Sequence, residues 1–168
     1  MRPACDDRWC HRHGRGFTLI ELMVVVLIAA LVLAAGVPAL HDLSSEQQLV
    51  TAANEFFHSV QLTRSEALRH GRRAEMRPVA GDDWHSGWEI MIGEQVVSRR
   101  PALASQIAVA YTTGGELVAY QPGGQPVTRG SWYFSNERQA RVVVINFLGR
   151  VRVCNPLRDS QCSKAGIE

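Results

Sequence analysis

Residues 16–21, Gly-Phe-Thr-Leu-Ile-Glu, decide how the rest of this 168-residue chain is organised. The glycine ends a short basic leader, and the apolar run that begins at Phe17 continues to Leu40. Glu21 is the only formal charge in that run, which otherwise has the length and polarity of a membrane-spanning helix. The free energy of inserting a charged side chain at the centre of a membrane helix is about 2.5–3.5 kcal/mol, and it is lower near the interface. The presence of this acid therefore requires an explanation.

The stretch that begins at Gly16 resembles the processing motif of type IV prepilins and of the pseudopilins of type II secretion. The resemblance implies that a prepilin peptidase cuts after Gly16 and methylates the new amino group on Phe17. The glutamate of the family, fifth after the cut, falls on Glu21, and its helix-bending proline, twenty-second after the cut, falls on Pro38. We therefore expect Phe17 to be the first residue of the mature chain.

Glu21 and Pro38 are the candidate residues for filament assembly. The free amine on Phe17 of a neighbouring subunit could pair with the carboxylate of Glu21, which would favour packing at one axial register. The alternative is an acid that reaches the lipid headgroups. Pro38 removes one backbone donor, so we expect a bend or local melting there that helps the subunit leave the bilayer, or else a passive kink.

An ordinary secretory signal peptide is the alternative interpretation of the N-terminus. The basic leader, the apolar core at 22–33 and the small residues at 34–36 fit cleavage near Ala35, which would leave a soluble β domain. Against this, Glu21 interrupts the start of the apolar run, and Gly16 lies directly before it. The mass of the mature chain separates the two interpretations.

After Pro38 the pattern becomes amphipathic, and Gly71 provides a helix stop signal. Apolar residues recur at steps of three and four, which predicts that the helix continues with one face packed on a domain. They are Leu49, Ala53, Phe56, Phe57, Val60, Ala67 and Leu68. The predicted divisions are a cleaved leader at 1–16, a transmembrane and filament-core helix at 17–40, its amphipathic continuation at 41–71 and a β-rich head at 72–168.

The pattern beyond Gly71 predicts short strands separated by turns rich in glycine. The predicted strands are 73–79, 87–92, 95–99, 107–111, 117–120, 132–134, 141–147 and 151–154. Residues 122–126 contain too many helix and strand breakers for regular structure and predict a loop. The expected fold class is α+β, with a long N-terminal helix packed on an all-β head of two antiparallel sheets.

The charges and cysteines indicate which side of the membrane each part occupies. Basic residues before the apolar run keep the leader cytoplasmic, so we expect a single-pass inner-membrane protein whose head is periplasmic. Cys154 and Cys162 then lie in an oxidising compartment, and we predict a disulfide between them worth about 2–3 kcal/mol. Two free thiols are the alternative.

Nothing in the sequence predicts catalysis, a metal or a cofactor. Ser65, Glu66 and His70 share one helix end, where a nucleophile and its base rarely meet. Cysteines and histidines at 5–13 belong to the leader that is cut away. Trp84, Trp88 and Trp132 are expected in the core or at a sheet edge rather than in a ligand cage.

Three segments resemble the H-type minor pseudopilins of type II secretion and the FimT-like minor pilins. They are Arg64-Ser65-Glu66-Ala67, Trp84 with Gly87-Trp88, and Gly149-Arg150-Val151-Arg152-Val153. The resemblance implies a filament subunit whose partners are the prepilin peptidase, the inner membrane and other major and minor pilins or pseudopilins. In the FimT-like branch, a Gly-Arg-x-Arg element is associated with DNA binding during natural transformation.

An arginine cluster near the C-terminus gives that association a physical basis. Between Arg138 and Arg158 there are five arginines and no acid. Arg150 and Arg152 are one residue apart, so in a strand both leave the same face and can grip adjacent phosphates without sequence specificity. The candidate DNA-binding residues are Arg141, Arg150, Arg152, Arg158 and Lys164. Alternatively, these side chains are solvated or pair with Glu137, Asp159 or a neighbouring subunit.

Overall fold

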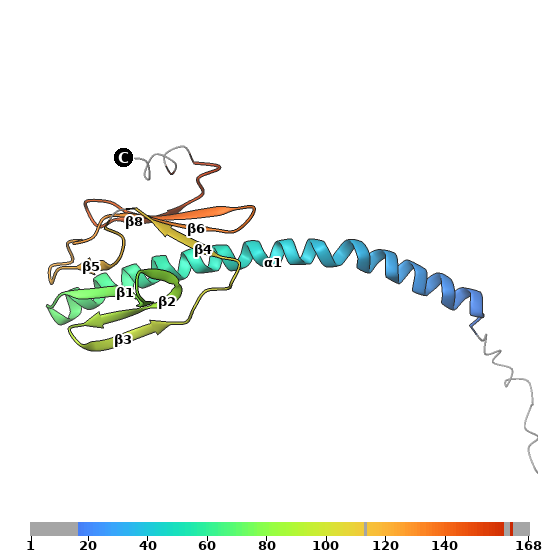
Figure 1. Ribbon diagram of the computed structural model, residues 1–168, viewed down its shortest axis with the longest axis horizontal. Coiled ribbons are helices and arrows are strands. Elements are labelled where there is room, and N and C mark those ends of the chain that lie inside the picture. Colours follow the sequence, from blue (N-terminus) through green and yellow to red (C-terminus); the bar gives the residue numbers. More distant parts are fainter. Residues whose placement is uncertain (1–16, 113, 160–161, 163–168) are drawn as a thin grey trace, which may run out of the picture. The chain divides into compact units, whose positions relative to one another are not determined.

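The computed structural model describes residues 17–112, 114–159 and 162, without the side chains of 35–42 (Figure 1). The predicted leader at 1–16, with Gly16, and the candidate Lys164 lie outside the described residues. Two compact units divide between His41 and Asp42. Helix α1 (Leu19–His70) begins in the first unit and ends in the second, where the β head follows it.

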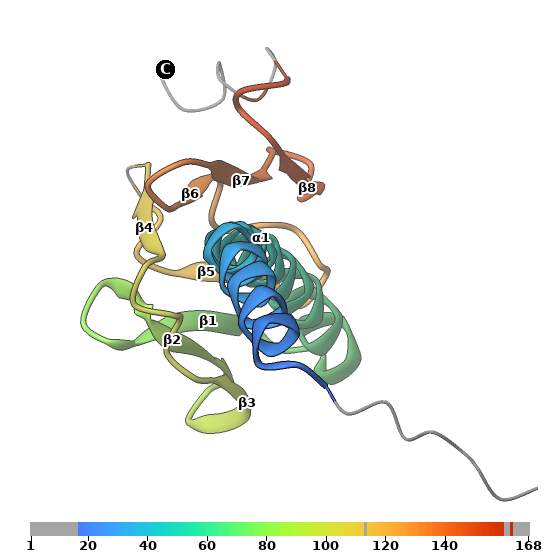
Figure 2. The same cartoon turned by 90° about the vertical axis from the view of Figure 1, so that its right-hand side faces the viewer.

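The head contains two antiparallel sheets of four strands each, as predicted. One sheet has the order β3-β2-β1-β5 and the other β4-β6-β7-β8. Figure 2 looks along α1 and shows the helix between them, with β1 and β2 on one side and β6 and β7 on the other. The strands are β1 (Ala74–Ala80), β2 (Asp83–Ile92), β3 (Gln95–Arg100), β4 (Ala108–Tyr111), β5 (Val118–Tyr120), β6 (Gly130–Ser135), β7 (Ala140–Ile145) and β8 (Val151–Cys154).

The strand predictions are correct in number and order, and they differ from the structure at the ends. Strand β2 begins at Asp83, four residues before the predicted start at Gly87. Strand β7 ends at Ile145 rather than at residue 147. The side chain of Asn146 accepts hydrogen bonds from the amides of Leu148 (3.0 Å) and Arg150 (2.9 Å), so the chain turns there instead of extending.

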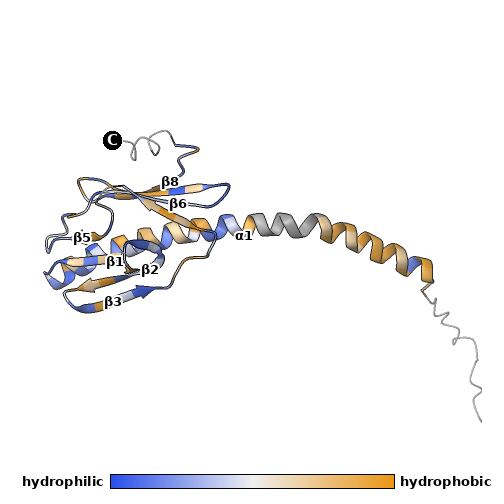
Figure 3. Ribbon diagram, viewed as in Figure 1, coloured by the Kyte–Doolittle hydropathy of each residue, from blue (hydrophilic) through white to orange (hydrophobic). Residues whose placement is uncertain are grey.

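Helix α1 begins two residues after the predicted Phe17 and ends as predicted at Gly71. Gly71 has φ 57°, and the amide of Arg72 donates to the carbonyl of Ala67 at 3.3 Å, which is a typical left-handed helix end. The bounds of α1 include residues 36–38, so the backbone at the predicted kink is helical, and the bend itself stays a prediction. Figure 3 shows the change from the apolar first turns to the mixed later part.

Within the part of the chain that the structure describes, no helix combines the length and apolarity needed to cross a membrane. The transmembrane role of residues 17–40 stays a prediction.

The amphipathic half of α1 fills the core between the sheets. Leu49, Ala53, Phe56, Val60 and Ala67 are fully buried, as predicted, and Phe57 is partly buried. Leu68 was assigned to the same face and is 53% exposed, so that assignment is wrong. It lies two residues before the last helical residue, His70, and its side chain lies beside Gly124 in the loop after β5.

Phe56 occupies the centre of the core. Its ring centroid lies 5.1 Å from Trp84, 5.4 Å from Trp88 and Trp132, and 5.3 Å from Phe134. The three tryptophans are thus core residues that join both sheets to the helix. The indole nitrogens of Trp84 and Trp132 both donate to the carbonyl of Gly115, at 2.8 and 3.1 Å. One carbonyl group therefore accepts a hydrogen bond from a tryptophan of each sheet.

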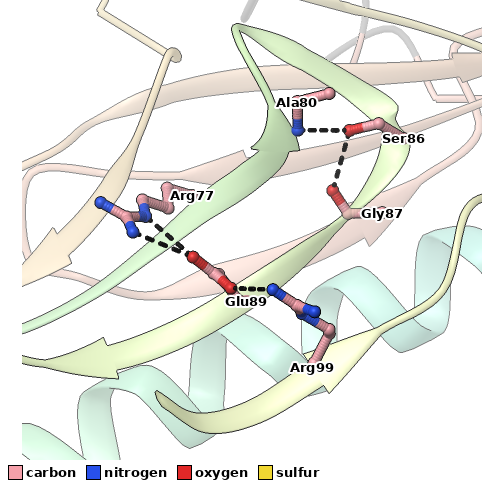
Figure 4. A network of polar contacts seen from close by, with 6 residues as sticks. All are labelled: Arg77, Ala80, Ser86, Gly87, Glu89 and Arg99. Carbon is pink, nitrogen blue, oxygen red and sulfur yellow. Dashed lines mark hydrogen bonds and ion pairs between the residues drawn. The ribbon is translucent and has the colours of Figure 1, made fainter. Parts of the chain in front are cut away.

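An Arg-Glu-Arg ladder crosses three strands of the first sheet (Figure 4). Glu89 on β2 is opposite Arg77 on β1 and Arg99 on β3. Oε1 of Glu89 accepts from Nε and Nη2 of Arg77, both at 3.0 Å, and Oε2 accepts from Nη2 of Arg99 at 2.9 Å. The hydrogen bonds from Arg99 and Arg77 lower the pKa of Glu89 below its ordinary value.

The predicted disulfide between Cys154 and Cys162 is present. Cys154 ends β8, and Cys162 is fully buried. The bond therefore ties the segment after β8 back to the second sheet.

Candidate functional site

The start of α1 presents a continuous apolar surface. Every residue from 17 to 34 is exposed, and Phe17 itself is 77% exposed. The hydroxyl of Thr18 accepts a hydrogen bond from the amide of Glu21 at 3.3 Å, which caps the helix, and the acid lies in the first turn, where the helix dipole favours it. An exposed apolar surface of this extent requires a partner that covers it.

A second candidate site is an open hollow of about 740 Å³ between α1 and the β7–β8 hairpin. We call it the arginine hollow, because three guanidinium groups lie along it, those of Arg64, Arg150 and Arg152. Its other lining residues are Gln61, Val144, Asn146, Gly149 and Val151. The arrangement combines positive charge with amide groups that can donate hydrogen bonds, which suits an anionic ligand.

Strand β8 determines which side chains reach the hollow. Val151 and Val153 are half-buried and pack against the core, whereas Arg152 between them is exposed. Arg150 directly precedes the strand and is also exposed. The alternation of a strand therefore places both arginines outside the head, as expected from their spacing.

A rigid turn holds Arg150 beside the helix. Gly149 has φ 74°, and a Cβ atom there would lie 3.1 Å from Cδ of Pro126, so this position suits glycine. Its carbonyl accepts a hydrogen bond from Nη1 of Arg64 at 3.3 Å. The contact fixes Arg64, which is half-buried on α1, at one side of the hollow.

Tyr120 lies beneath this turn. Its Cε1 atom would lie 3.6 Å from a Cβ atom on Gly149, and its hydroxyl is buried without a hydrogen-bond partner among the described residues. Burial raises the pKa of Tyr120 to about 12, although the charge of Arg64 acts in the opposite direction. The phenol therefore stays neutral and can still donate a hydrogen bond.

Not all of the predicted arginines meet at the hollow. Arg141 does not line it: its side chain is 17% exposed, lies 3.6 Å from Glu46 on α1 and donates from Nη1 to the carbonyl of Ala140 at 2.9 Å. Arg158 lies in the turn after β8 and does not line the hollow either. Arg141 is therefore separate from Arg150 and Arg152, because its side chain lies towards the helix, and its assignment to a DNA-binding surface stays a prediction.

Sequence reasoning missed Arg64, the third arginine of the hollow. It is separated from Gly149 by 85 positions in the chain, and only the packing of α1 against the second sheet brings the two together. The spacing of neighbouring residues in the sequence does not reveal such a contact. The one available signal was its position four residues after Val60 and three before Ala67, at the spacing of the apolar face.

The helix end around Ser65 has no catalytic arrangement. The hydroxyl of Ser65 donates to the carbonyl of Leu62 at 2.9 Å. Glu66 faces His70 at 3.1 Å and Arg69 at 3.6 Å, so the serine and the histidine are not paired. Among the described residues, no group of three metal-binding side chains occurs.

Comparisons with known proteins identify two regions of the chain that match family models. A family model described as the type II transport protein GspH matches residues 52–149, and a model of the prokaryotic N-terminal methylation motif matches residues 11–37. None of the curated proteins searched matches the chain.

Two solved structures share the fold. The type IV minor pilin FimU of Pseudomonas aeruginosa is 20% identical with a TM-score of 0.61, and the match covers 69% of this chain and 95% of FimU. The minor pseudopilin EpsH from the type 2 secretion system of Vibrio cholerae is 13% identical with a TM-score of 0.54, covering 65% of this chain and 98% of EpsH. These similarities confirm the predicted α+β fold, a helix packed on two sheets.

Proposed function

The chain belongs to the GspH family of type II transport proteins, and from this premise we propose that it enters a periplasmic filament of the secretion machinery as a minor pseudopilin. Members of this family are structural subunits rather than enzymes, which agrees with the prediction of no catalytic activity. The observation that carries the proposal is the order of the two matches, with the methylation motif at 11–37 directly before a pseudopilin head at 52–149.

The first step in this proposal is maturation. A prepilin peptidase removes residues 1–16 and methylates the amino group of Phe17. Residues 17–40 then hold the subunit in the inner membrane with its head in the periplasm, until the subunit moves into the filament. The exposed apolar surface of residues 17–34 supports this step, because lipid can cover it before assembly and neighbouring helices afterwards.

The second step is recognition between subunits. Glu21 is the only acid in the apolar segment, and it lies one turn from the new N-terminus. The carboxylate of an entering subunit pairs with the amine on Phe17 of its neighbour, and this pairing offsets the cost of holding both charges in an apolar surrounding. Pro38 would supply the flexibility that lets the helix leave the bilayer.

Two measurements test this function. Mass spectrometry of the mature protein should find methylated Phe17 as the first residue; a chain cut near Ala35 would instead indicate an ordinary signal peptide. Glu21→Ala should leave the head folded and abolish incorporation into filaments. Glu94→Ala, which changes an exposed acid in the β2–β3 turn, is the matched control and should incorporate normally. Normal incorporation of Glu21→Ala would refute the pairing.

The arginine hollow favours a second candidate function, the binding of DNA by a FimT-like pilin during natural transformation. Arg64, Arg150 and Arg152 converge there from two elements, and phosphate groups are the ligands that such a set of guanidinium groups holds best. Contacts limited to phosphates would give weak binding that salt suppresses, with little sequence preference. Arg158 and Lys164 could extend the patch.

A titration of the detergent-solubilised mature chain with duplex DNA at several salt concentrations tests the second function. Arg150→Ala/Arg152→Ala should lower the affinity several-fold and flatten the dependence on salt. Arg129→Ala is the matched control, because this arginine is exposed on the loop before β6 and does not line the hollow. Equal affinities for all three proteins would remove DNA binding from consideration.

A further inference from the structure

The turn between β7 and β8 exposes an aromatic ring beside the arginine hollow. Asn146 and Gly149, the first and last residues of this turn, both line the hollow, and Phe147 and Leu148 lie between them. Phe147 is 70% exposed and Leu148 is 59% exposed. The predicted strand 141–147 included Phe147, whereas β7 ends at Ile145 and leaves the ring at the rim of the hollow.

Hydrogen bonds hold the backbone of this turn in place. The amide of Gly149 donates to the carbonyl of Asn146 at 2.9 Å, and the amide of Asn146 donates to the carbonyl of Arg150 at 3.1 Å. The side-chain oxygen of Asn146 accepts from the amides of Leu148 and Arg150. Because the turn is already ordered, it has little backbone entropy to lose when a ligand covers the ring of Phe147.

The two apolar side chains of the turn do not contribute to the core of the head. Neither Phe147 nor Leu148 belongs to the buried cluster or to the side chains packed against it. A single exposed apolar side chain is ordinary on a protein surface. Two adjacent ones on an ordered turn, next to a cationic hollow, form a surface that can hold the apolar and the anionic parts of one ligand.

The ring of Phe147 lies within reach of the arginines. Arg150 follows the turn directly and is exposed. Phe147 and Arg150 are three residues apart, so their Cα atoms are separated by at most about 11 Å. A nucleic acid strand combines the two kinds of group that this surface can bind, because each nucleotide carries a base with a flat π-face and a negatively charged phosphate.

A duplex and a single strand present different groups to such a surface. In a duplex the bases stack on one another and their faces are covered, whereas an unpaired base can stack on an aromatic side chain. Guanidinium groups alone favour the duplex, which has the higher density of charge. An exposed ring beside them favours the single strand.

We propose that the arginine hollow, with Phe147 at its rim, binds single-stranded DNA, with a base stacked on the ring of Phe147 and neighbouring phosphates held by Arg150 and Arg152. The inference rests on the second candidate function, since it names the form of DNA that the same site takes. Every base has a π-face, so stacking adds affinity without adding sequence preference.

Fluorescence anisotropy with three labelled probes tests the inference on the detergent-solubilised mature chain. The probes are a DNA strand of about 12 nucleotides, the same strand paired with its complement, and an abasic strand of equal length, which keeps the phosphates without the bases. The wild-type chain should bind the single strand several-fold more tightly than the duplex or the abasic strand. A site made of arginines alone would bind the duplex best, and that order would overturn the inference.

Variants of Phe147 identify the contribution of the ring. Phe147→Ala should weaken binding of the single strand about 5- to 10-fold, which is the lower part of the range for base stacking. It should leave the affinity for the abasic strand and the slope of affinity against salt unchanged, because the ring carries no charge. Phe147→Leu, the matched control for apolar bulk, should lose as much affinity as Phe147→Ala, whereas Phe147→Trp keeps an aromatic face and should retain it.

The arginine variant separates this inference from the function on which it rests. If Arg150→Ala/Arg152→Ala bound all three probes as well as the wild type does, DNA binding would fall, and the stacking with it. If that variant lost affinity while Phe147→Ala and Phe147→Leu did not, only the stacking would be overturned. Unchanged DNA binding by Phe147→Ala, together with lost incorporation into filaments, would assign the ring to a protein neighbour and would also overturn the stacking.

Discussion

Phe56→Ala should be the most damaging single truncation in the head. The ring of Phe56 is fully buried and contacts four other aromatic rings at 5.1–5.4 Å, drawn from both sheets. Truncating a buried phenylalanine to alanine costs about 3–5 kcal/mol, and more when the surroundings cannot close the cavity. Here the walls belong to two sheets and a helix, so we expect a loss at the upper end, about 5 kcal/mol, against a total stability of about 5–15 kcal/mol.

Urea unfolding of residues 42–168, followed by tryptophan fluorescence, measures this loss. Residues 42–168 contain three tryptophans, Trp84, Trp88 and Trp132, and all of them are buried in the described core, so the signal reports directly on the site. Phe147→Ala makes the same chemical change at a side chain that is 70% exposed, and it should cost less than about 0.5 kcal/mol. Equal midpoints for the two variants would refute the assignment of Phe56 as the centre of the core.

Two further predictions concern the sheets. Glu89→Gln should destabilise the head by about 1–2 kcal/mol at pH 7, because it leaves two arginines without their charged partner. Since the folded pKa of Glu89 is lowered, its contribution is present above the unfolded pKa and is lost as the pH falls through the folded pKa. Urea titrations should therefore show that the difference in the free energy of unfolding between the wild type and Glu89→Gln shrinks below about pH 4.5. A difference that stays constant with pH would contradict this role of Glu89. Cys154→Ser/Cys162→Ser should lower the free energy of unfolding by about 2–3 kcal/mol, and reduction of the wild-type head should reproduce that value while leaving the double variant unchanged.

Local patterns were sufficient to predict the elements of the fold. The steps of three and four among Leu49, Ala53 and Phe56 predicted the buried face of the helix, and Gly71 predicted where it ends. Glycine-rich turns predicted all eight strands in order. These features depend on neighbours in the chain, so the sequence reports them directly.

The composition of the arginine hollow could not be predicted in the same way. Arg64 reaches Gly149 only because α1 lies against the second sheet, and sequence spacing carries no information on that contact. Arg141 looked equivalent to Arg150, but its side chain packs beside Glu46. Phe147 was assigned to a strand, although the side chain of Asn146 ends the strand before it and leaves the ring exposed.

The middle layer of the head is the second half of α1, which has a mechanical consequence. A force applied to the N-terminal half of α1 would act on the aromatic rings around Phe56 through the continuous backbone of the helix. Traction on the helix is then resisted by both sheets at once through the shared carbonyl of Gly115. Withdrawal of the helix from the head would therefore have to separate Phe56 from the aromatic rings of both sheets.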